Sequence, residues 1–157
     1  METNFKVKAL NSDEFSQLFH LSNVELEKSG IKRIIVDSNS GFPCRVSLKD
    51  ANIGEEVILL PYKHHQTNSP YQSGGPIYVR KNSTTANLRV NEVPKMLLHR
   101  LLSLRGYDVD GMMVQATVIE GNNIKAEINS FFLNSKISYI HIHNAKPGCF
   151  NCSIERF

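Results

Sequence analysis

The chain has 157 residues, of which 41% are hydrophobic and 21% charged, and its formal net charge at pH 7 is +3. This length suits a single domain, residues 1–157, with a buried core, and the composition is that of a soluble globular protein, which excludes extended disorder. No apolar run approaches the roughly 18 residues of a membrane-spanning helix, so we expect no membrane partner.

The N-terminal residues and the cysteines indicate a cytoplasmic protein. Met1–Lys6 lacks the charged start and apolar stretch of a secretion signal. Cys44, Cys149 and Cys152 are an odd number of cysteines in a chain without an export signal, which is typical of free thiols rather than of a disulfide framework.

The first part of the chain predicts two strands with two short helices between them. Asn4–Leu10 alternates apolar and polar residues, as a half-buried strand does. Asn11 is expected to cap one short helix, and a capping box that begins at Ser22 predicts a second helix that ends at Gly30. Lys32–Asp37 is rich in β-branched residues and predicts the next strand.

A turn that begins at Gly41 leads into Cys44–Leu48, which predicts a short strand. Because successive side chains of a strand point to opposite faces, we expect Cys44 to lie with the core and Arg45 on a polar face. Cys44 is then either a small buried apolar residue or a thiolate activated by a nearby cation. Arg45 can bind a carboxylate or phosphate through its planar guanidinium, with an exposed ion pair as the alternative.

The middle of the chain predicts a central strand, a long loop and another strand. Val57–Leu60 is apolar on both faces, which favours the centre of a sheet. Tyr62–Gly75 is polar and long for a connection, and such loops are often functional. We expect its adjacent histidines, His64 and His65, to lie at the surface with at most one facing a site. Pro76–Lys81 predicts a strand that resumes the alternation.

Positive charge is concentrated between positions 80 and 105, a stretch that contains six basic residues and one acidic residue. The basic residues are Arg80, Lys81, Arg89, Lys95, Arg100 and Arg105. Such a patch attracts a small anion, an acidic protein or a phosphate backbone, and a solvated face is the alternative. We expect no nucleic-acid partner, because no binding signature accompanies the charge.

Leucines at helical spacing predict a long amphipathic helix from Asn91 to Leu104, ended by Gly106. Met112–Glu120 then predicts a strand, and Ile124–Leu133 predicts a second amphipathic helix.

The last stretch predicts a hairpin with a polar face. Tyr139, His141 and His143 share one face of a strand, and after a turn Cys149 belongs to the polar set while Phe150, Cys152 and Ile154 belong to the core. A zinc site with four ligands is poorly supported, because Cys149 and Cys152 point to opposite faces. An open site made by His141, His143 and Cys149 is geometrically conceivable, but no carboxylate base accompanies it, so we expect no metal.

Seven segments together resemble a bacterial family, the domain of unknown function 1203. They are, in chain order, 41–48, 54–60, 69–71, 75–80, 101–105, 110–113 and 143–149. The similarity spans nearly the whole chain, and Cys152 is not part of the family pattern. The resemblance implies no established activity, substrate or cofactor.

We therefore predict an α+β domain with a mixed, largely antiparallel sheet flanked by helices. The polar faces are expected to meet in one pocket beside the Ser69–Gly75 loop, lined by Arg45, Arg80, Arg105, His141, His143 and Cys149. The leading hypothesis is a binding domain for a small anionic ligand, with the three arginines as charge partners and the hydroxyls of Tyr71 and Ser73 as donors.

Two alternatives belong to other functional classes. The first is an enzyme of unknown reaction that uses Cys149 or Cys44 as nucleophile and His141 or His143 as base. The second is a protein-interaction module that uses the basic stretch between positions 80 and 105.

Overall fold

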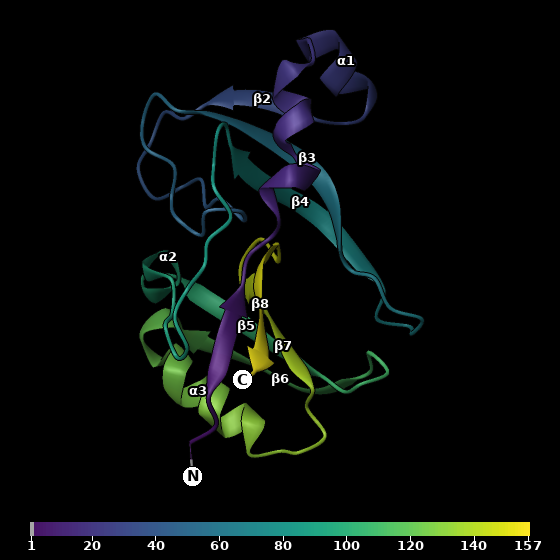
Figure 1. Cartoon of the computed structure of the whole chain (residues 1–157), viewed down its shortest axis with the longest axis vertical. Coiled ribbons are helices and arrows are strands. Elements are labelled where there is room, and N and C mark those ends of the chain that lie inside the picture. The colour runs from purple at the N-terminus through teal and green to yellow at the C-terminus, as the bar shows by residue number, and fades with distance from the viewer. Residues whose placement is uncertain (1) are drawn as a thin grey trace.

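The structure, a computed structural model, describes residues 2–157, so Met1, where the predicted domain begins, lies outside it. Figure 1 shows two antiparallel sheets, one at each end of the molecule. The large sheet has five strands in the order β1 (Phe5–Lys8), β8 (Phe150–Arg156), β7 (Tyr139–Asn144), β5 (Leu101–Tyr107) and β6 (Met113–Glu120). The small sheet has three, in the order β2 (Lys32–Ile35), β3 (Glu56–His65) and β4 (Ser73–Arg80). The predicted α+β class is confirmed.

The helices are short and cover the outer faces of the sheets. They are the α-helices α1 (Asn23–Lys28), α2 (Lys95–Leu98) and α3 (Ile124–Phe132), and the 3-10 helices η1 (Ser12–Glu14), η2 (Ser16–His20) and η3 (Gly121–Asn123). The predicted capping box is confirmed, because Ser22 and Glu25 each accept a hydrogen bond from the other's backbone N–H. Asn11 caps as expected, but the helix that it begins is a 3-10 helix. No helix within residues 2–157 has the length and apolarity to cross a bilayer.

Each sheet has its own core. One face of the large sheet packs against α3, which buries Ile124, Ile128, Phe131 and Phe132 as the amphipathic pattern predicts. Ile140 and Ile142 of β7 enter the same core, so the histidines of this strand face the opposite side of the sheet. The small sheet packs with α1 and the 3-10 helices η1 and η2 over a second cluster that includes Leu26 and Ile58.

The predicted strand at Cys44–Leu48 is wrong. The segment is a tight turn with single β-bridges at Pro43 and Cys44, and Leu48 has a φ of 52°. Strand alternation therefore does not apply, and Arg45 is buried with only 1% of its surface exposed. Cys44 is fully buried, which agrees with its reading as a small apolar residue.

The predicted helix from Asn91 to Leu104 is also wrong, except at Lys95–Leu98. Helix α2 ends at Leu98, and β5 begins at Leu101. The leucines after that point alternate instead, with Leu102 and Leu104 fully buried. Because β5 pairs with both β6 and β7, strand pairing overrides the helical spacing.

The predicted loop at Tyr62–Gly75 is mostly a hairpin. β3 runs to His65 and β4 starts at Ser73, with a register shift between Tyr62 and His65. As β2 pairs with β3 only up to Leu59, the rest of β3 lies free of the small sheet's third strand. This far end of the hairpin meets the face of the large sheet that carries His141 and His143, which we call the histidine face.

Candidate functional site

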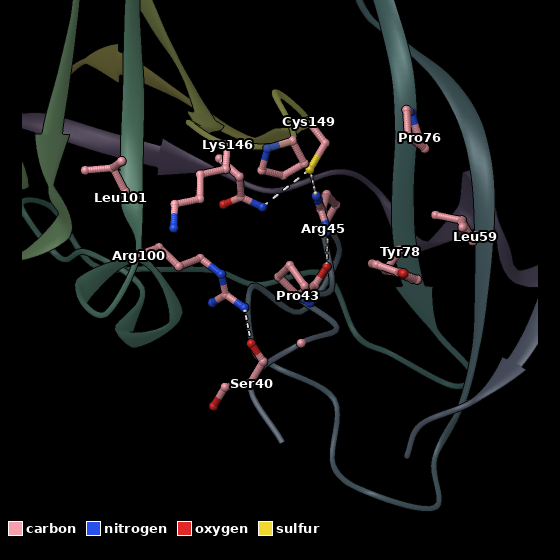
Figure 2. A pocket seen from close by; sticks show the side chains of 13 residues that line it. Ser40, Pro43, Arg45, Leu59, Pro76, Tyr78, Arg100, Leu101, Lys146 and Cys149 are labelled. Atoms are coloured by element: carbon pink, nitrogen blue, oxygen red, sulfur yellow. Dashed lines mark hydrogen bonds between the residues drawn. The ribbon is translucent and has the colours of Figure 1, made fainter. Parts of the chain in front are cut away.

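A cavity of about 530 Å³ lies where the two sheets meet. Figure 2 shows Leu101, Arg100 and Lys146 on one side, Tyr78, Leu59 and Pro76 of the β3–β4 hairpin on the other, and Arg45 and Cys149 between them. The remaining lining residues are Ser40, Gly41, Pro43, Asn144 and Pro147. This volume lies within the range of small-molecule sites, which form preferentially at such junctions.

Arg45 is the buried cation of this cavity. Its guanidinium donates to the carbonyl oxygen of Phe150 at 2.6 Å, to that of Pro43, and to the sulfur of Cys149 at 3.2 Å. None of these partners is a carboxylate, and Arg45 makes no ion pair within the described part of the chain. Burial lowers the pKa of Arg45, although the Cys149 sulfur acts in the opposite direction. The side chain stays charged at neutral pH, because arginine does not lose its proton in proteins.

The other two cations of the cavity differ in their partners. Arg100 is neutralised by Asp50, with Nη2 2.6 Å from Oδ1, and it also donates to the carbonyl oxygen of Ser40. Lys146 is exposed and pairs with no carboxylate among residues 2–157. No acidic residue lines the cavity. Its potential is therefore positive, with Arg45 and Lys146 as the uncompensated charges.

Cys149 lies in the wall of this cavity and is partly exposed. Its sulfur accepts hydrogen bonds from Arg45 and from the amide of Asn144, the latter at 3.4 Å. The side-chain oxygen of Asn144 accepts in turn from Asn151 at 2.7 Å, which fixes the orientation of the amide. No hydrogen bond joins Cys149 to a histidine in residues 2–157.

Arg80 lines a different hollow. This second groove, of about 1120 Å³, follows the segment from Arg80 to His99. Arg80 is held there by Glu55 at 2.6 Å and by the hydroxyl of Ser47 at 3.2 Å. Lys81 likewise pairs with Glu56 at 3.6 Å. Much of the positive charge of the basic stretch is therefore compensated by neighbouring carboxylates.

The histidine face of the large sheet is a third candidate region. None of its histidines lines the cavity between the sheets or the second groove. β5 and β7 are in register there, with Arg105 opposite His141 and Tyr107 opposite Tyr139. The predicted alignment of Tyr139, His141 and His143 on one face is confirmed. Ile140 and Ile142, which alternate with them along β7, enter the core on the other face of the sheet, and His141 and His143 are themselves buried. Arg105 is half-buried, and its Nε donates to the hydroxyl of Ser103 at 3.4 Å.

Both histidines of the β3–β4 hairpin contact this face, which the sequence did not predict. The ring centroids of His64 and His143 are 4.8 Å apart, and those of His65 and His141 are 4.9 Å apart. The Nδ1 of His65 donates to the carbonyl oxygen of Tyr71 at 2.7 Å, and its Nε2 accepts from the Tyr139 hydroxyl at 2.6 Å. The register shift in β3 is what allows adjacent histidines to approach the same face.

Phe150 belongs to the histidine face and not to the core, contrary to the sequence-based alternation. The β7–β8 register shifts after Ile142, so Phe150 lies opposite His143. Its ring stacks on that of His64 with centroids 5.1 Å apart and planes at 4°. Its carbonyl oxygen accepts from Arg45, so Phe150 connects a residue of the cavity wall with the histidine face.

Protonation of the histidine rings is disfavoured by their surroundings. Burial lowers the pKa of His64 to about 4, that of His141 to about 2 and that of His143 to about 3. The positive charge of Arg105 acts in the same direction on all three. The three imidazoles are therefore neutral at pH 7.

The expected single pocket is thus divided among three places. Arg45 and Cys149 share the cavity between the sheets, Arg80 lies in the second groove, and Arg105 lies with His141 and His143. Tyr71 and Ser73 belong to the hairpin end beside the histidines, where Ser73 pairs with His65. The cavity itself contains residues that sequence reasoning did not assign to a site, among them Lys146 and Tyr78.

Comparison with known proteins gives one match. The family model described as "Protein of unknown function (DUF1203)" matches residues 41–156. No curated protein and no solved structure matches the chain. The matched region contains every side chain of the cavity except that of Ser40, and it contains all the histidines of the histidine face.

Proposed function

The chain belongs to the DUF1203 family of proteins of unknown function, and we propose that it binds a small anionic molecule with an apolar body in the cavity between the two sheets. The observation that carries the proposal is Arg45, a buried guanidinium on the cavity wall without a carboxylate partner. A buried charge is costly unless it is paired, and a bound carboxylate or phosphate supplies the missing partner.

Arg45 retains donors for such a ligand. A guanidinium has five N–H groups, and the two carbonyl oxygens and the sulfur occupy three of them. The backbone partners hold the group in a fixed orientation, so little side-chain freedom is lost when an anion binds.

Lys146 adds a second positive charge at the opening. It comes from the turn between β7 and β8 and is exposed to solvent. A mobile lysine at the rim and a fixed arginine at the wall together favour a compact anionic group over a neutral polar one.

The rest of the cavity suits an apolar body. Leu59, Tyr78 and Leu101 present aliphatic and aromatic surface, and three prolines complete it. Tyr78 packs edge-on against Phe42 with centroids 5.0 Å apart, which fixes its ring. The ligand class that fits is therefore an aliphatic or aromatic carboxylate or phosphate monoester.

Isothermal titration with hexanoate, phenylacetate and phenyl phosphate tests this function. We expect at least one probe to bind with one site per chain and Lys146→Gln to weaken it by about 5-fold, the effect of about 1 kcal/mol from one exposed charge pair. Lys136→Gln, at an exposed position that lines neither hollow, is the matched control. Absence of binding by all three probes, or equal affinities for the two variants, contradicts the proposal.

A second candidate function is suggested by the sulfur of Cys149. Two donors point at it, from Arg45 and Asn144, and the thiol is partly exposed in the cavity wall. The same cavity then holds an anionic substrate beside a nucleophile, as an enzyme of unknown reaction requires. Alkylation of the thiol discriminates this function from simple binding, with Cys149→Ser as the blank.

A further inference from the structure

Three histidine rings converge on the histidine face from two different elements. His64 comes from β3, and His141 and His143 come from β7. Each ring offers one nitrogen, and these three nitrogens all lie within 4.8 Å of one another. His64 is far from His141 and His143 in the sequence, so its convergence with them is a product of the fold.

Each of the three rings also has a buried nitrogen without a partner in the described chain. The Nδ1 atoms of His64 and His141 and the Nε2 atom of His143 are buried and make no hydrogen bond within the described chain. His141 is 5% exposed and His143 is fully buried, so water does not replace the missing partners easily. A buried unpaired polar atom costs about 1–3 kcal/mol, and three such atoms in one cluster of rings indicate a ligand that satisfies them together.

The surroundings already orient the rings. His143 Nδ1 donates to the carbonyl oxygen of Gly148 at 2.9 Å, which leaves the lone pair on Nε2. A backbone carbonyl in this role is the usual outer partner of a metal-binding histidine. Phe150 stacks on His64 and packs its ring against His141 and His143 as well, with centroids 5.0 and 5.7 Å away.

We propose that His64, His141 and His143 bind one divalent first-row transition metal ion, with zinc as the reference ion. Imidazole nitrogen suits Zn²⁺, Cu²⁺ or Ni²⁺, whereas Mg²⁺ and Ca²⁺ need oxygen ligands that this cluster lacks. Tetrahedral Zn–N bonds of about 2.0–2.1 Å place ligand nitrogens about 3.4 Å apart, so the rings close inward when the ion binds. This site departs from the sequence-based expectation of no metal, which lacked His64.

Three protein ligands leave a fourth position for water or an exogenous ligand, as in metal sites that perform chemistry. Arg105 lies opposite His141 on the neighbouring strand and makes no ion pair among residues 2–157. Its charge acts on all three rings, so it favours an anion as the fourth ligand. The site is independent of the cavity between the sheets, because none of its ligands lines that cavity.

Zinc titration of the full chain, stripped of metal by a chelator, tests the proposal. We expect one Zn²⁺ per chain and a loss of affinity of about 100-fold or more in His64→Ala and in His143→Ala, since even an outer partner is worth about 10- to 100-fold. The half-exposed His64 carries the test if His143→Ala does not fold. Co²⁺ in place of zinc should give the intense visible absorption of tetrahedral coordination.

Two controls separate this site from others. His20→Ala removes an exposed histidine of η2 and should leave zinc affinity unchanged. Cys149→Ser removes the nearest partly exposed thiol of the β7–β8 hairpin and should also leave it unchanged. The proposal is overturned if the chain binds no zinc at one equivalent, if His64→Ala keeps the full affinity, or if either control loses it.

Discussion

Nη2 of Arg45 lies 3.2 Å from the sulfur of Cys149, across the wall of the cavity between the sheets. The two residues are 104 positions apart in the chain. Arg45 comes from a tight turn beside the small sheet, and Cys149 comes from the hairpin that closes the large one. Their contact therefore joins the two sheets and sets the charge of the cavity at the same time.

Cys149 should be the reactive thiol of the folded protein. At pH 7, iodoacetamide should modify it at least about 10-fold faster than Cys44 or Cys152, because access and a neighbouring cation govern thiol reactivity. Both of the other thiols are fully buried, and burial raises the pKa of Cys152 to about 12. Peptide mapping by mass spectrometry measures the three rates. Equal rates for all three cysteines would remove the enzyme hypothesis.

Arg45→Ala should lower the free energy of unfolding by about 3 kcal/mol. The change leaves the carbonyl oxygens of Phe150 and Pro43 without their buried donor, at about 1–3 kcal/mol each. Urea denaturation measures the loss. Arg105→Ala is the control, because its half-buried guanidinium makes a single long hydrogen bond within residues 2–157 and its loss should cost less than about 1 kcal/mol. An unchanged midpoint in Arg45→Ala would show that this network does not join the sheets.

The ion pair of Asp50 with Arg100 should make the free energy of unfolding depend on pH in the acidic range. Burial alone raises the pKa of Asp50, but the hydrogen bonds and charge of Arg100, helped by His99, outweigh it, so the pKa falls below 3.8. A carboxylate whose pKa is lower in the folded state stabilises the fold above its unfolded pKa, and this contribution disappears as pH falls through the folded value.

Asp50→Asn should therefore reduce the free energy of unfolding near pH 6 by about 1–3 kcal/mol and by progressively less below about pH 4. Urea denaturation of both proteins across this range gives the difference. If the difference in unfolding free energy is constant with pH, or increases as the pH falls, the ion pair does not control the loss of stability at low pH.

Arg105→Gln should strengthen zinc binding at the three histidines. Removing a positive charge beside a dication is expected to improve the binding free energy by about 1 kcal/mol, or about 5-fold. The effect should shrink with added salt, since the guanidinium is only half-buried. Titrations of both proteins at two salt concentrations provide the comparison, and weaker binding in the variant would show that Arg105 supports the site in another way.

Gly121→Ala should destabilise the fold by about 3 kcal/mol, because a buried backbone has no room for an added methyl group. A Cβ at Gly121 would lie 1.9 Å from the carbonyl oxygen of Leu97, at the junction of α2 and η3. Gly75→Ala is the matched control, since nothing lies within 4 Å of its Cβ position. Thermal unfolding that is equal in the two variants would contradict this packing.

Regular elements were predictable from the sequence where a single periodicity applied. The alternation of β7 separates His141 and His143 from Ile140 and Ile142, and the structure confirms it. The apolar positions of α3 are also confirmed. In both elements local pattern and tertiary packing agree, so sequence reasoning succeeds.

The candidate site was less predictable, because it depends on irregular backbone. Arg45 lies in a turn whose geometry is set by the positive φ of Leu48 and by contacts with β4, so strand alternation misplaced it. The predicted central strand stops at Leu60, just before Pro61, and proline is excluded from central strands. β3 tolerates Pro61 because β2 pairs only as far as Leu59, and the strand continues to His64. No local signal in the sequence indicated that His64 would reach β7.

The pairing of β1 with β8 has a consequence for synthesis of the protein. Phe5 lies opposite Arg156, so the first strand of the chain waits for the last one before it gains a partner in the large sheet. Until β8 has emerged from the ribosome, the nascent chain exposes the unpaired backbone of β1 and one edge of β7. A contact of such long sequence separation forms slowly, so we expect the pairing of β1 with β8 to set the pace at which the large sheet forms.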